Sequence, residues 1–478
     1  MRRSLGRGFV GAVCAMVLVA SAMAFGALVT EPVAATDAAA LKGGFRRAQK
    51  NGWTYVHLQG TPRQVGYQNG YLLAPEIDDT LKMFQLELTH DNHKDWQFFR
   101  TAAETIMWPR IEDEYRQELQ GIADGARAKG VKLDLWDVVA MNAALEWSYY
   151  VTEYDKAHGI KTAPPTVAEH CSAFVATGSY TKDHKIVIAH NNWSSYLDGV
   201  RWRILYDIVP AKGHHVLMDG IAGVIHSADD FGMNDAGIVI TETTIGRFHG
   251  FDEQGIPEFV RARKAMQYSE TIDDFARIMK DGNNGGYANS WLVGDTRHNE
   301  IARLELGLKN VTLERTKDGV FIGSNFPIAP KLVKEETEFD PTDMSASGNA
   351  RHLRWDQLMM ANKGKIDVAL AEGFLADHYD TYEKKDQPSE RTLDGHPDLS
   401  PRGYPGWVGP YGTVGAVQNK VADAKMVRHM TLVAAAGHAC GMTFKASEHV
   451  SAHPEYNWQK SSLKDMDAQP WTKFKASK

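Results

Sequence analysis

Residues 155–170 read DKAHGIKTAPPTVAEH, and Cys171-Ser172-Ala173-Phe174 follow directly. The first stretch holds two prolines and shows no hydrophobic period, which is typical of an exposed loop or linker. From Cys171 the hydrophobic period changes to two, which is typical of β-strands. This cysteine therefore stands where a linker, residues 155–170, meets a strand-rich block, residues 171–478.

The part before the linker, residues 41–154, is predicted to be mostly helical. Residues 53–59 alternate as a strand does, and Gly60-Thr61-Pro62 then combines a turn, a helix N-cap and a proline at the first helical position. Gly66 and Gly70 lie four residues apart, so we expect one face of this helix to pack closely on another helix. Two further segments show helical spacing, residues 111–126 and 133–147.

The part after the linker alternates between strands and helices. Strands are expected over residues 171–180, 184–190, 202–209, 214–221, 236–245, 287–295, 299–306, 310–316 and 319–323, with a hairpin turn at 317–319. Helices are expected over residues 257–280, 349–362 and 366–378. The tail from about residue 400 is rich in Gly, Pro and Trp, which predicts an irregular wrap. This order predicts an α+β fold with layered sheets, in which residues 41–478 form one domain.

The N-terminus has the layout of a signal peptide. Residues 1–7 contain three arginines and no acid, and an apolar run, residues 9–29, follows. Small-residue A-x-A sites stand at 22–24 and 38–40. We therefore expect residues 1–40 to hold a signal peptide and a short N-terminal segment, and the protein to be exported, periplasmic or secreted. The alternative is an anchor retained through residues 9–29, which would just span a bilayer.

Composition excludes several classes of protein. The net charge is −7, from 53 Lys and Arg against 60 Asp and Glu, which argues against non-specific nucleic-acid binding. The three cysteines, Cys14, Cys171 and Cys440, make neither a disulfide framework nor a four-thiolate zinc site. No HExxH, P-loop or G-x-S-x-G motif is present, and the adjacent His214 and His215 would diverge in a strand. We expect no metal and no cofactor.

Cys171 is the candidate nucleophile. If the peptide bond before it were cut, its thiol and its new α-amine would share one residue, and an amine with a pKa of about 8 can act as a general base. Two other interpretations remain open: a buried strand cysteine, and a papain-type site with a partner His and an Asn or Asp. Nineteen histidines leave the papain-type interpretation undecided, although its local signature is absent. Cys440 is expected to be a free, partly buried thiol, because a nucleophilic Cys171 must stay reduced.

Several motifs together resemble a known family. Cys171-Ser172-Ala173-Phe174 and then His190-Asn191-Asn192-Trp193 look like the phospholipase B-like family. Further segments fall in the family's order: 227–231 (SADDF), 241–244 (TETT), 286–291 (GYANSW) and 354–357 (RWDQ). The similarity runs over roughly residues 50–470. Residues 60–77 also resemble the acyltransferase group that includes the penicillin acyltransferases, and both groups are N-terminal-nucleophile hydrolases.

The resemblance implies a four-layer αββα sandwich and self-cleavage between His170 and Cys171, with the two resulting chains held together. It places three side chains beside the nucleophile: His190, Asn192 and Trp193. Among the oxyanion candidates it implies Thr244, at the end of a strand, and Asn289, whose carboxamide would hold the oxyanion or the α-amine. Arg351 is implied as the group that orients the amine or lowers the pKa of the thiol.

The function expected from these features is hydrolysis of an acyl ester or linear amide bond in a small-molecule acyl substrate. The thiolate of Cys171 would attack the acyl carbonyl, and the α-amine would protonate the leaving group and then activate water. Two alternatives stay open. One is an amidase or acyltransferase of the penicillin acyltransferase type, and the other is a processed lipid- or peptide-binding protein without turnover.

Overall fold

A computed structural model describes residues 35–161, 171–228 and 231–477 of the chain. The described residues from Ala40 onward form one compact unit. The expected signal segment, residues 1–34, and the last linker residues, 162–170 with His170, lie outside the described residues. Within the described ranges, we find no helix with the length and apolar character that a membrane crossing requires.

The larger sheet has nine strands in the order β1-β2-β5-β6-β7-β8-β9-β10-β11. Strands β2 and β5 run parallel, and all other neighbours in this sheet run antiparallel. Its strands are β1 (Phe45–Arg46), β2 (Thr54–Gly60), β5 (Ile204–Pro210), β6 (Val216–Gly220), β7 (Gly232–Asn234), β8 (Ile238–Thr244), β9 (Asn289–Asp295), β10 (Glu300–Leu306) and β11 (Val311–Thr316).

The smaller sheet has six antiparallel strands in the order β12-β3-β4-β15-β16-β17. They are β12 (Gly319–Gly323), β3 (Ser172–Thr177), β4 (Val187–Ser195), β15 (Val414–Asp423), β16 (Thr431–Ala436) and β17 (Thr472–Lys475). Strands β13 (Tyr379–Asp380) and β14 (Lys385–Asp386) form a separate short pair. Strand β4, which carries His190, is therefore central in its sheet.

The two sheets pack face to face through a core to which both contribute. Leu205, Val239 and Leu292 of the larger sheet belong to the same buried cluster as Val175 and Leu432 of the smaller one. Apolar burial of this kind is the main favourable contribution to folding. It places the first residues of β3, next to Cys171, between two layers of strands.

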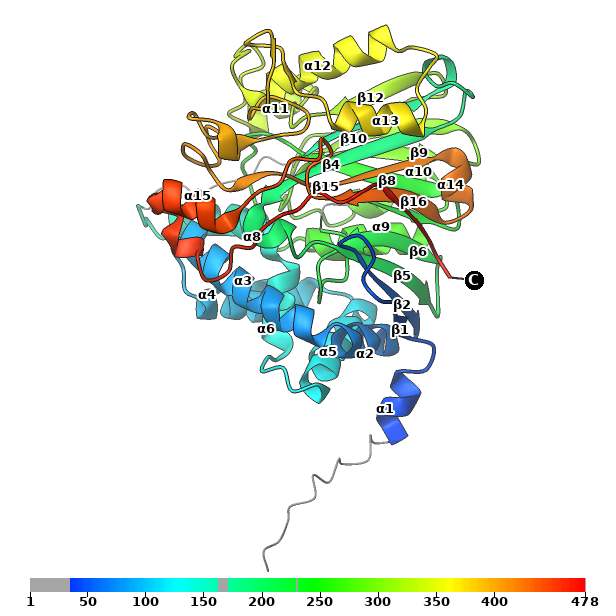
Figure 1. Cartoon of the computed structure of the whole chain (residues 1–478). Helices are drawn as coiled ribbons and strands as arrows, with labels where there is room; N and C mark the ends of the chain where they lie inside the picture. Colours follow the sequence, from blue (N-terminus) through cyan, green and yellow to red (C-terminus); the bar gives the residue numbers. More distant parts are fainter. Residues whose placement is uncertain (1–34, 162–170, 229–230, 478) are drawn as a thin grey trace, which may run out of the picture. The chain divides into compact units, whose positions relative to one another are not determined.

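Helices cover the outer faces of both sheets, and Figure 1 shows them on opposite sides. The larger sheet packs against the helices α2 (Pro62–Leu72), α3 (Ala74–Asn92), α4 (Trp96–Ala102), α5 (Asp113–Ala128), α6 (Leu135–Asn142), α7 (Trp147–Ala157), α9 (Glu258–Tyr268) and α10 (Ile272–Lys280). The smaller sheet packs against α12 (Ser347–Ala361) and α13 (Val368–Leu375). The remaining α-helices of the described residues are short: α1 (Ala35–Ala40), α8 (Tyr196–Gly199), α11 (Pro330–Glu336), α14 (Ala424–Arg428) and α15 (Ala446–Ala452). The predicted α+β class is confirmed.

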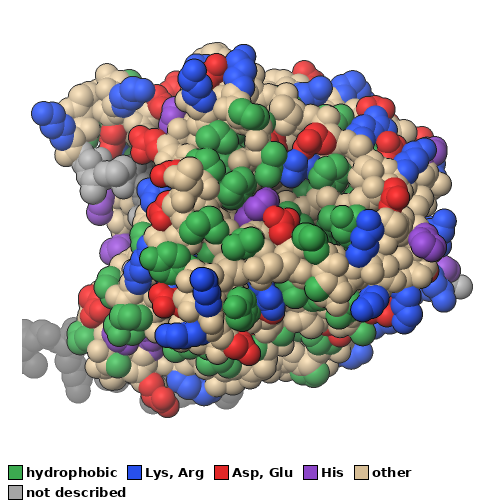
Figure 2. Space-filling model, turned by 90° about the horizontal axis from the view of Figure 1, so that it is seen from above, with side chains coloured by type: hydrophobic (Ala, Val, Ile, Leu, Met, Phe, Trp, Pro, Cys, Tyr) green, Lys and Arg blue, Asp and Glu red, His purple; other side chains and the backbone are tan. Residues whose placement is uncertain are grey.

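On the face that bears α12, basic and acidic side chains are interspersed with hydrophobic ones (Figure 2). Leu353 and Met360 of α12 are among the exposed apolar side chains, and Met360 is 77% exposed. Single exposed apolar residues of this kind are ordinary on a globular surface.

The N-terminal helix pair forms as the sequence predicts. The Thr61 hydroxyl accepts from the backbone N–H of Gln64, and the Gln64 side chain accepts from the Thr61 N–H, so a capping box starts α2. The glycines of α2 lie against α5, because a Cβ on Gly66 would stand 1.9 Å from the carbonyl oxygen of Glu118. A side chain there would force the two helices apart.

Three expectations are wrong in detail. The stretch 257–280 is two helices, α9 and α10, separated at residues 269–271. The turn at 317–318 is not a hairpin, because β11 is the edge of the larger sheet and β12 the edge of the smaller one. The linker begins later than residue 155, since α7 runs to Ala157 and Asp155 is buried in an ion pair with Lys94 at 2.6 Å.

The expected irregular wrap after residue 400 is also wrong, because residues 414–436 supply β15 and β16 of the smaller sheet. The apolar pattern is hidden there by buried polar residues. Lys420 donates to Asp219 at 3.1 Å, and the Gln418 amide donates to the same carboxylate at 2.9 Å. A strand whose inward positions are polar but paired does not show the alternation that predicts a strand.

Candidate active site

Cys171 directly precedes β3 and is fully buried. Its φ is +86°, in the left-handed region that a residue with a Cβ rarely adopts. Such a conformation costs on the order of 1–3 kcal/mol and persists only where the surroundings impose it. The torsion φ is defined by the carbonyl carbon of the preceding residue, so cutting the 170–171 bond would remove this cost.

The thiol of Cys171 lies among three polar side chains. Its Sγ is 3.7 Å from Asn192 Oδ1 and 3.9 Å from Glu242 Oε1, with the thiol as donor. The ligand-type atoms of Cys171, His190 and Glu242 all lie within 4.8 Å of one another. Tyr287 donates its hydroxyl to Glu242 Oε1 at 2.8 Å. The sulfur is therefore within reach of an imidazole and a carboxylate, both held in the interior.

The alternation of β4 decides which of its side chains face the thiol. Ile188 belongs to the core between the sheets, whereas Val187 and Ala189 belong to the core under α12 and α13. His190 and Asn192 share the face of Ile188, because side chains in a strand alternate. The structure thus brings His190 and Asn192 to Cys171, as expected.

Trp193 lies on the opposite face of β4, so its indole does not stand beside the thiol as we expected. The guanidinium of Arg351 stacks over its ring at 4.4 Å, and its Nε1 donates to the Leu393 carbonyl at 3.2 Å. Because successive side chains of a strand point to opposite faces, Trp193 cannot line the same wall of the site as His190 and Asn192. Trp193 instead packs against the arginine that holds the backbone of Cys171.

Arg351, from α12, is buried and holds the backbone of Cys171. Its Nη1 donates to the Cys171 carbonyl oxygen at 2.5 Å and to Ser172 Oγ at 3.0 Å. Its Nη2 donates to Asn325 Oδ1 at 2.7 Å, and its Nε donates to Ser347 Oγ at 2.9 Å. Hydrogen bonds to a charged donor are the stronger kind, so these bonds fix the carbonyl side of Cys171.

Arg354, one turn further along the same helix, is not part of this network. It forms a bidentate pair with Asp377, with its Nη2 2.6 Å from Asp377 Oδ2. The two arginines of α12 therefore have separate roles.

Thr244 and Asn289 face each other across β8 and β9. The Thr244 carbonyl accepts from Asn325 Nδ2 at 2.9 Å, so one relay of hydrogen bonds runs from Thr244 through Asn325 and Arg351 to Cys171. Among the described residues, the Thr244 hydroxyl and both polar atoms of the Asn289 side chain have no hydrogen-bond partner although they are buried. Buried polar groups are nearly always paired, so the Thr244 hydroxyl and the Asn289 amide are suited to hydrogen bonds with a bound molecule.

A cavity of 270 Å³ has Tyr287 and Ser194 in its lining. Tyr287 thus touches both the cavity and Glu242. A second cavity, of 760 Å³, shares the stretch Trp407–Gly409 with the first. The apolar part of the first wall is formed by Phe84, Leu88, Ala144, Leu145, Tyr149, Trp407, Val408 and Trp458.

Two buried acids also line the first cavity. Burial and the nearby Asp198 charge raise the pKa of Glu87 well above its usual value. Burial likewise raises the pKa of Asp198 to about 7, against hydrogen bonds that lower it. Asp198 Oδ1 has no hydrogen-bond partner among the described residues. The cavity therefore combines an apolar wall with carboxyl groups that favour the protonated form.

Comparison with known proteins identifies the family of this chain. A model described as Phospholipase B matches residues 50–313, which is more than half of the chain. The chain belongs to the phospholipase B family. The match includes Cys171, His190, Asn192, Thr244 and Asn289, whereas the arginine on α12 lies beyond it.

Individual relatives are similar over about half of this chain. Phospholipase B-like protein C of Dictyostelium discoideum is 23% identical over 293 residues, 51% of this chain and 50% of its own. An uncharacterized protein of Archaeoglobus fulgidus is 26% identical over 260 residues, 52% of this chain and 42% of its own. The acyl-coenzyme A:6-aminopenicillanic-acid-acyltransferase 40 kDa form of Emericella nidulans is 24% identical over 251 residues, 51% of this chain and 61% of its own. The chain spans about half the length of the curated relatives it matches.

Three residues near Cys171 have no role that the sequence predicts, although Glu242 and Tyr287 lie in the motifs 241–244 and 286–291 of this phospholipase B family member. Glu242 is one acid in an otherwise apolar and threonine-rich strand, and such an isolated charge is a usable signal. Tyr287 and Asn325 adopt positive φ values of 50° and 64°, which the sequence does not reveal. Their roles arise from pairing between distant strands and loops.

Proposed function

We propose that this protein is an exported, self-processing N-terminal cysteine hydrolase that cleaves an acyl ester or a linear amide bond. The observation that carries the proposal is the setting of Cys171: a buried thiol next to His190 and Glu242, at a strand start with φ of +86°, with its carbonyl held by Arg351. The family and the names of the relatives favour the same chemistry.

The proposal includes a four-layer αββα sandwich of the N-terminal-nucleophile type, built from residues 41–478 as one domain. Two sheets packed face to face, with helices on both outer faces, support it. In this architecture the nucleophile opens a strand between the two sheets, which is the position of Cys171 before β3.

Maturation would begin with attack of the Cys171 thiol on the carbonyl of His170. A carbon–sulfur bond forms, the carbon–nitrogen bond breaks, and the released α-amine takes up a proton. Water then hydrolyses the thioester, which leaves a carboxylate on His170 and a free thiol and amine on Cys171. Relief of the strained φ favours this cut, because the first residue of a chain has no preceding carbonyl carbon.

Turnover would use the same groups. The α-amine takes the thiol proton, the sulfur attacks the substrate carbonyl, and the amine passes the proton to the leaving group. The buried amide of Asn289 and hydroxyl of Thr244 are the donors available to the oxyanion. A water activated by the amine then releases the acid. The 270 Å³ cavity beside Tyr287, with its apolar wall, suits the acyl group.

A second mechanism for the same reaction is supported by the closeness of Cys171, His190 and Glu242, whose functional atoms lie within 4.8 Å. In that case His190 would be the base and Glu242 would orient it, and no chain cleavage would be needed. The Emericella nidulans relative favours an alternative activity, that of an amidase or acyltransferase of the penicillin acyltransferase type. Binding of a lipid or peptide without turnover is the remaining one.

The deciding experiment is an intact-mass measurement of the purified protein under denaturing conditions, together with the Cys171→Ala variant. We expect two chains that copurify, of which the larger starts at Cys171. It holds 308 of the 478 residues, so its mass should be about 34 kDa of the total 53.1 kDa. Cys171→Ala should remain one chain without turnover. An active protein with the mass of one continuous chain would refute the N-terminal mechanism.

Export is tested separately by N-terminal sequencing of the protein recovered outside the cytoplasm. We expect the first residue to fall between 25 and 41, as the A-x-A sites indicate. An exported pool that still begins at Met1 would contradict the signal peptide.

A further inference from the structure

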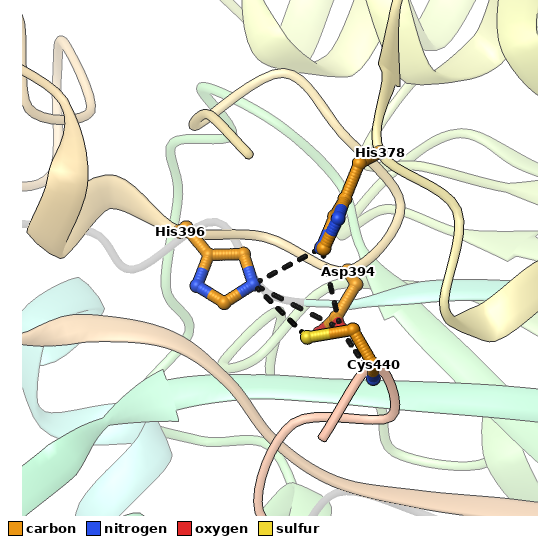
Figure 3. Close-up of side chains that lie close together, drawn as sticks. All are labelled: His378, Asp394, His396 and Cys440. Atoms are coloured by element: carbon orange, nitrogen blue, oxygen red, sulfur yellow. Dashed lines mark hydrogen bonds and ion pairs between the residues drawn. The ribbon is translucent and has the colours of Figure 1, made fainter. Parts of the chain in front are cut away.

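Four side chains with metal-binding atoms converge behind the smaller sheet, away from Cys171. His378 follows α13, Asp394 and His396 stand in the loop before β15, and Cys440 follows β16. Figure 3 shows the four side chains pointing toward one another. Their ligand atoms all lie within 4.8 Å of one another.

The distances within this cluster are those of a tetrahedral ion site. His378 Nε2 is 3.2 Å from His396 Nε2 and 3.5 Å from Asp394 Oδ2. His396 Nε2 is 3.8 Å from Asp394 Oδ2 and 3.8 Å from Cys440 Sγ. Zinc bonds of about 2.0–2.3 Å in tetrahedral geometry place ligand atoms roughly 3.3–3.8 Å apart. Four of the six pair distances thus fit a tetrahedral zinc ion, and the other two, both from Cys440 Sγ, are no longer than 4.8 Å.

Further contacts hold the ligands in place. The backbone N–H of Cys440 donates to Asp394 Oδ2 at 2.9 Å, and His438 Nδ1 lies 3.2 Å from Asp394 Oδ1. Asp394 and His396 are at most 1% exposed. Hydrogen bonds to the residues that bind a metal orient these ligands and raise the affinity for the metal.

We propose that His378, Asp394, His396 and Cys440 bind one Zn²⁺ ion. Two imidazoles and a thiolate favour zinc over calcium or magnesium, which take oxygen ligands. Four protein ligands leave no open position, so the ion is structural rather than catalytic. The sequence does not predict this site, because its four ligands are spread over 62 positions and form no local motif.

The ion would brace the strand that bears His190 and Asn192. The carbonyl of Leu393, next to ligand Asp394, accepts from Asn191 Nδ2 at 2.8 Å and from Trp193 Nε1 at 3.2 Å. Fixing the 394–396 loop to the segment after β16 thus fixes the outer face of β4. The inner face of the same strand lies against the Cys171 thiol.

Two other groups of side chains could also bind a metal ion. Cys171, His190 and Glu242 form one, and His396, Asp398 and His438 form the other. Each offers three protein ligands, one fewer than the proposed site. Cys171→Ala affects only the first, Asp398→Asn only the second, and His378→Ala or Cys440→Ser only the proposed site.

The first experiment measures zinc in purified full-chain protein after dialysis against excess Zn²⁺ and then buffer. We expect about one zinc ion per chain in the native protein, in Cys171→Ala and in Asp398→Asn, and at least about tenfold less in His378→Ala and Cys440→Ser. Absence of zinc from the native protein, retention in Cys440→Ser, or loss in Cys171→Ala would each overturn the proposal.

The second experiment does not depend on the folding of ligand variants. In the full chain carrying Cys14→Ser and Cys171→Ala, Cys440 is the only thiol left. Adding Co²⁺ to this protein should give tetrahedral d–d absorption and a thiolate-to-cobalt charge-transfer band. A cobalt complex without the thiolate band, or no complex, would refute ligation by Cys440.

Discussion

The guanidinium of Arg351 donates to the carbonyl oxygen of Cys171 at 2.5 Å, although 180 positions separate the two residues. The same arginine stacks on Trp193 and donates to Asn325, which in turn donates to the Thr244 carbonyl. One buried cation thus joins Cys171, the strand that bears His190 and the end of the strand that bears Thr244. The geometry of the proposed reaction depends on this arginine, although its hydrogen bonds go to the backbone of Cys171 and not to the sulfur.

Arg351→Lys should therefore slow both chain cleavage and turnover. A lysine ammonium cannot reproduce the planar fork that reaches Cys171, Asn325 and Ser347 together. Misplacing a reacting group by about 1 Å lowers a reaction rate on the order of 10²-fold, and we expect kcat to fall by that factor. Arg354→Lys on the same helix is the matched control and should keep the native rate. Equal losses in the two variants would show a general effect on α12 instead.

Asn289→Ala should lower kcat by on the order of 10²–10³-fold with little change in KM, if its amide donates to the oxyanion. Thr244→Val removes the neighbouring hydroxyl with almost no change in shape and should cost less, because a neutral hydroxyl offers a single donor. Steady-state kinetics on purified variants separate the two. A larger loss in Thr244→Val than in Asn289→Ala would exchange their roles.

The fold was predictable where local chemistry determines it. Thr61, Pro62 and Gly66 predict a capped helix in close contact with another, and this helix pair forms. Strand β15 was not predictable, because Gln418 and Lys420 are paired with Asp219 of the other sheet rather than with water. Tertiary pairing of polar residues removes the alternation on which strand prediction rests.

The site was predictable only in part for a similar reason. Cys171 and His190 lie in short motifs of one hairpin, β3 and β4, so their closeness follows from the sequence. Glu242 reaches the thiol from the other sheet and Tyr287 donates to Glu242, and no spacing along the chain indicates either contact. Trp193 was assigned to the wrong face because motif membership does not distinguish alternate positions of a strand.

The choice of base is tested by His190→Gln. If the α-amine is the base, kcat should fall by less than about 10²-fold, and the rising limb of the pH–rate profile should still reflect a group with a pKa of about 8. If His190 is the base, this limb should disappear and the loss should reach about 10²–10⁴-fold. Glu242→Gln should follow His190→Gln only in the second case.

Asp198 predicts a dependence of stability on pH. Burial raises its pKa from 3.8 to about 7, and the charges of Asp91 and Arg201 act on it in opposite directions. Glu87, whose pKa is also raised, lines the same cavity. Because the folded state holds the proton more tightly than the unfolded chain, the stabilisation is complete below pH 3.8 and is lost as the pH rises through about 7.

Asp198→Asn should therefore flatten this dependence and raise the thermal midpoint at pH 8, where the native protein buries a charged carboxylate. A single group of this kind changes the free energy of unfolding by at most about 1.4 kcal/mol per pH unit between its two pKa values. Thermal unfolding measured from pH 5 to pH 8 gives the slope directly. Glu104→Gln, at an exposed acid, is the control and should leave the slope unchanged. A variant at Asp198 that is less stable than the native protein at pH 8 would mean that the carboxylate is held by a partner in its charged form.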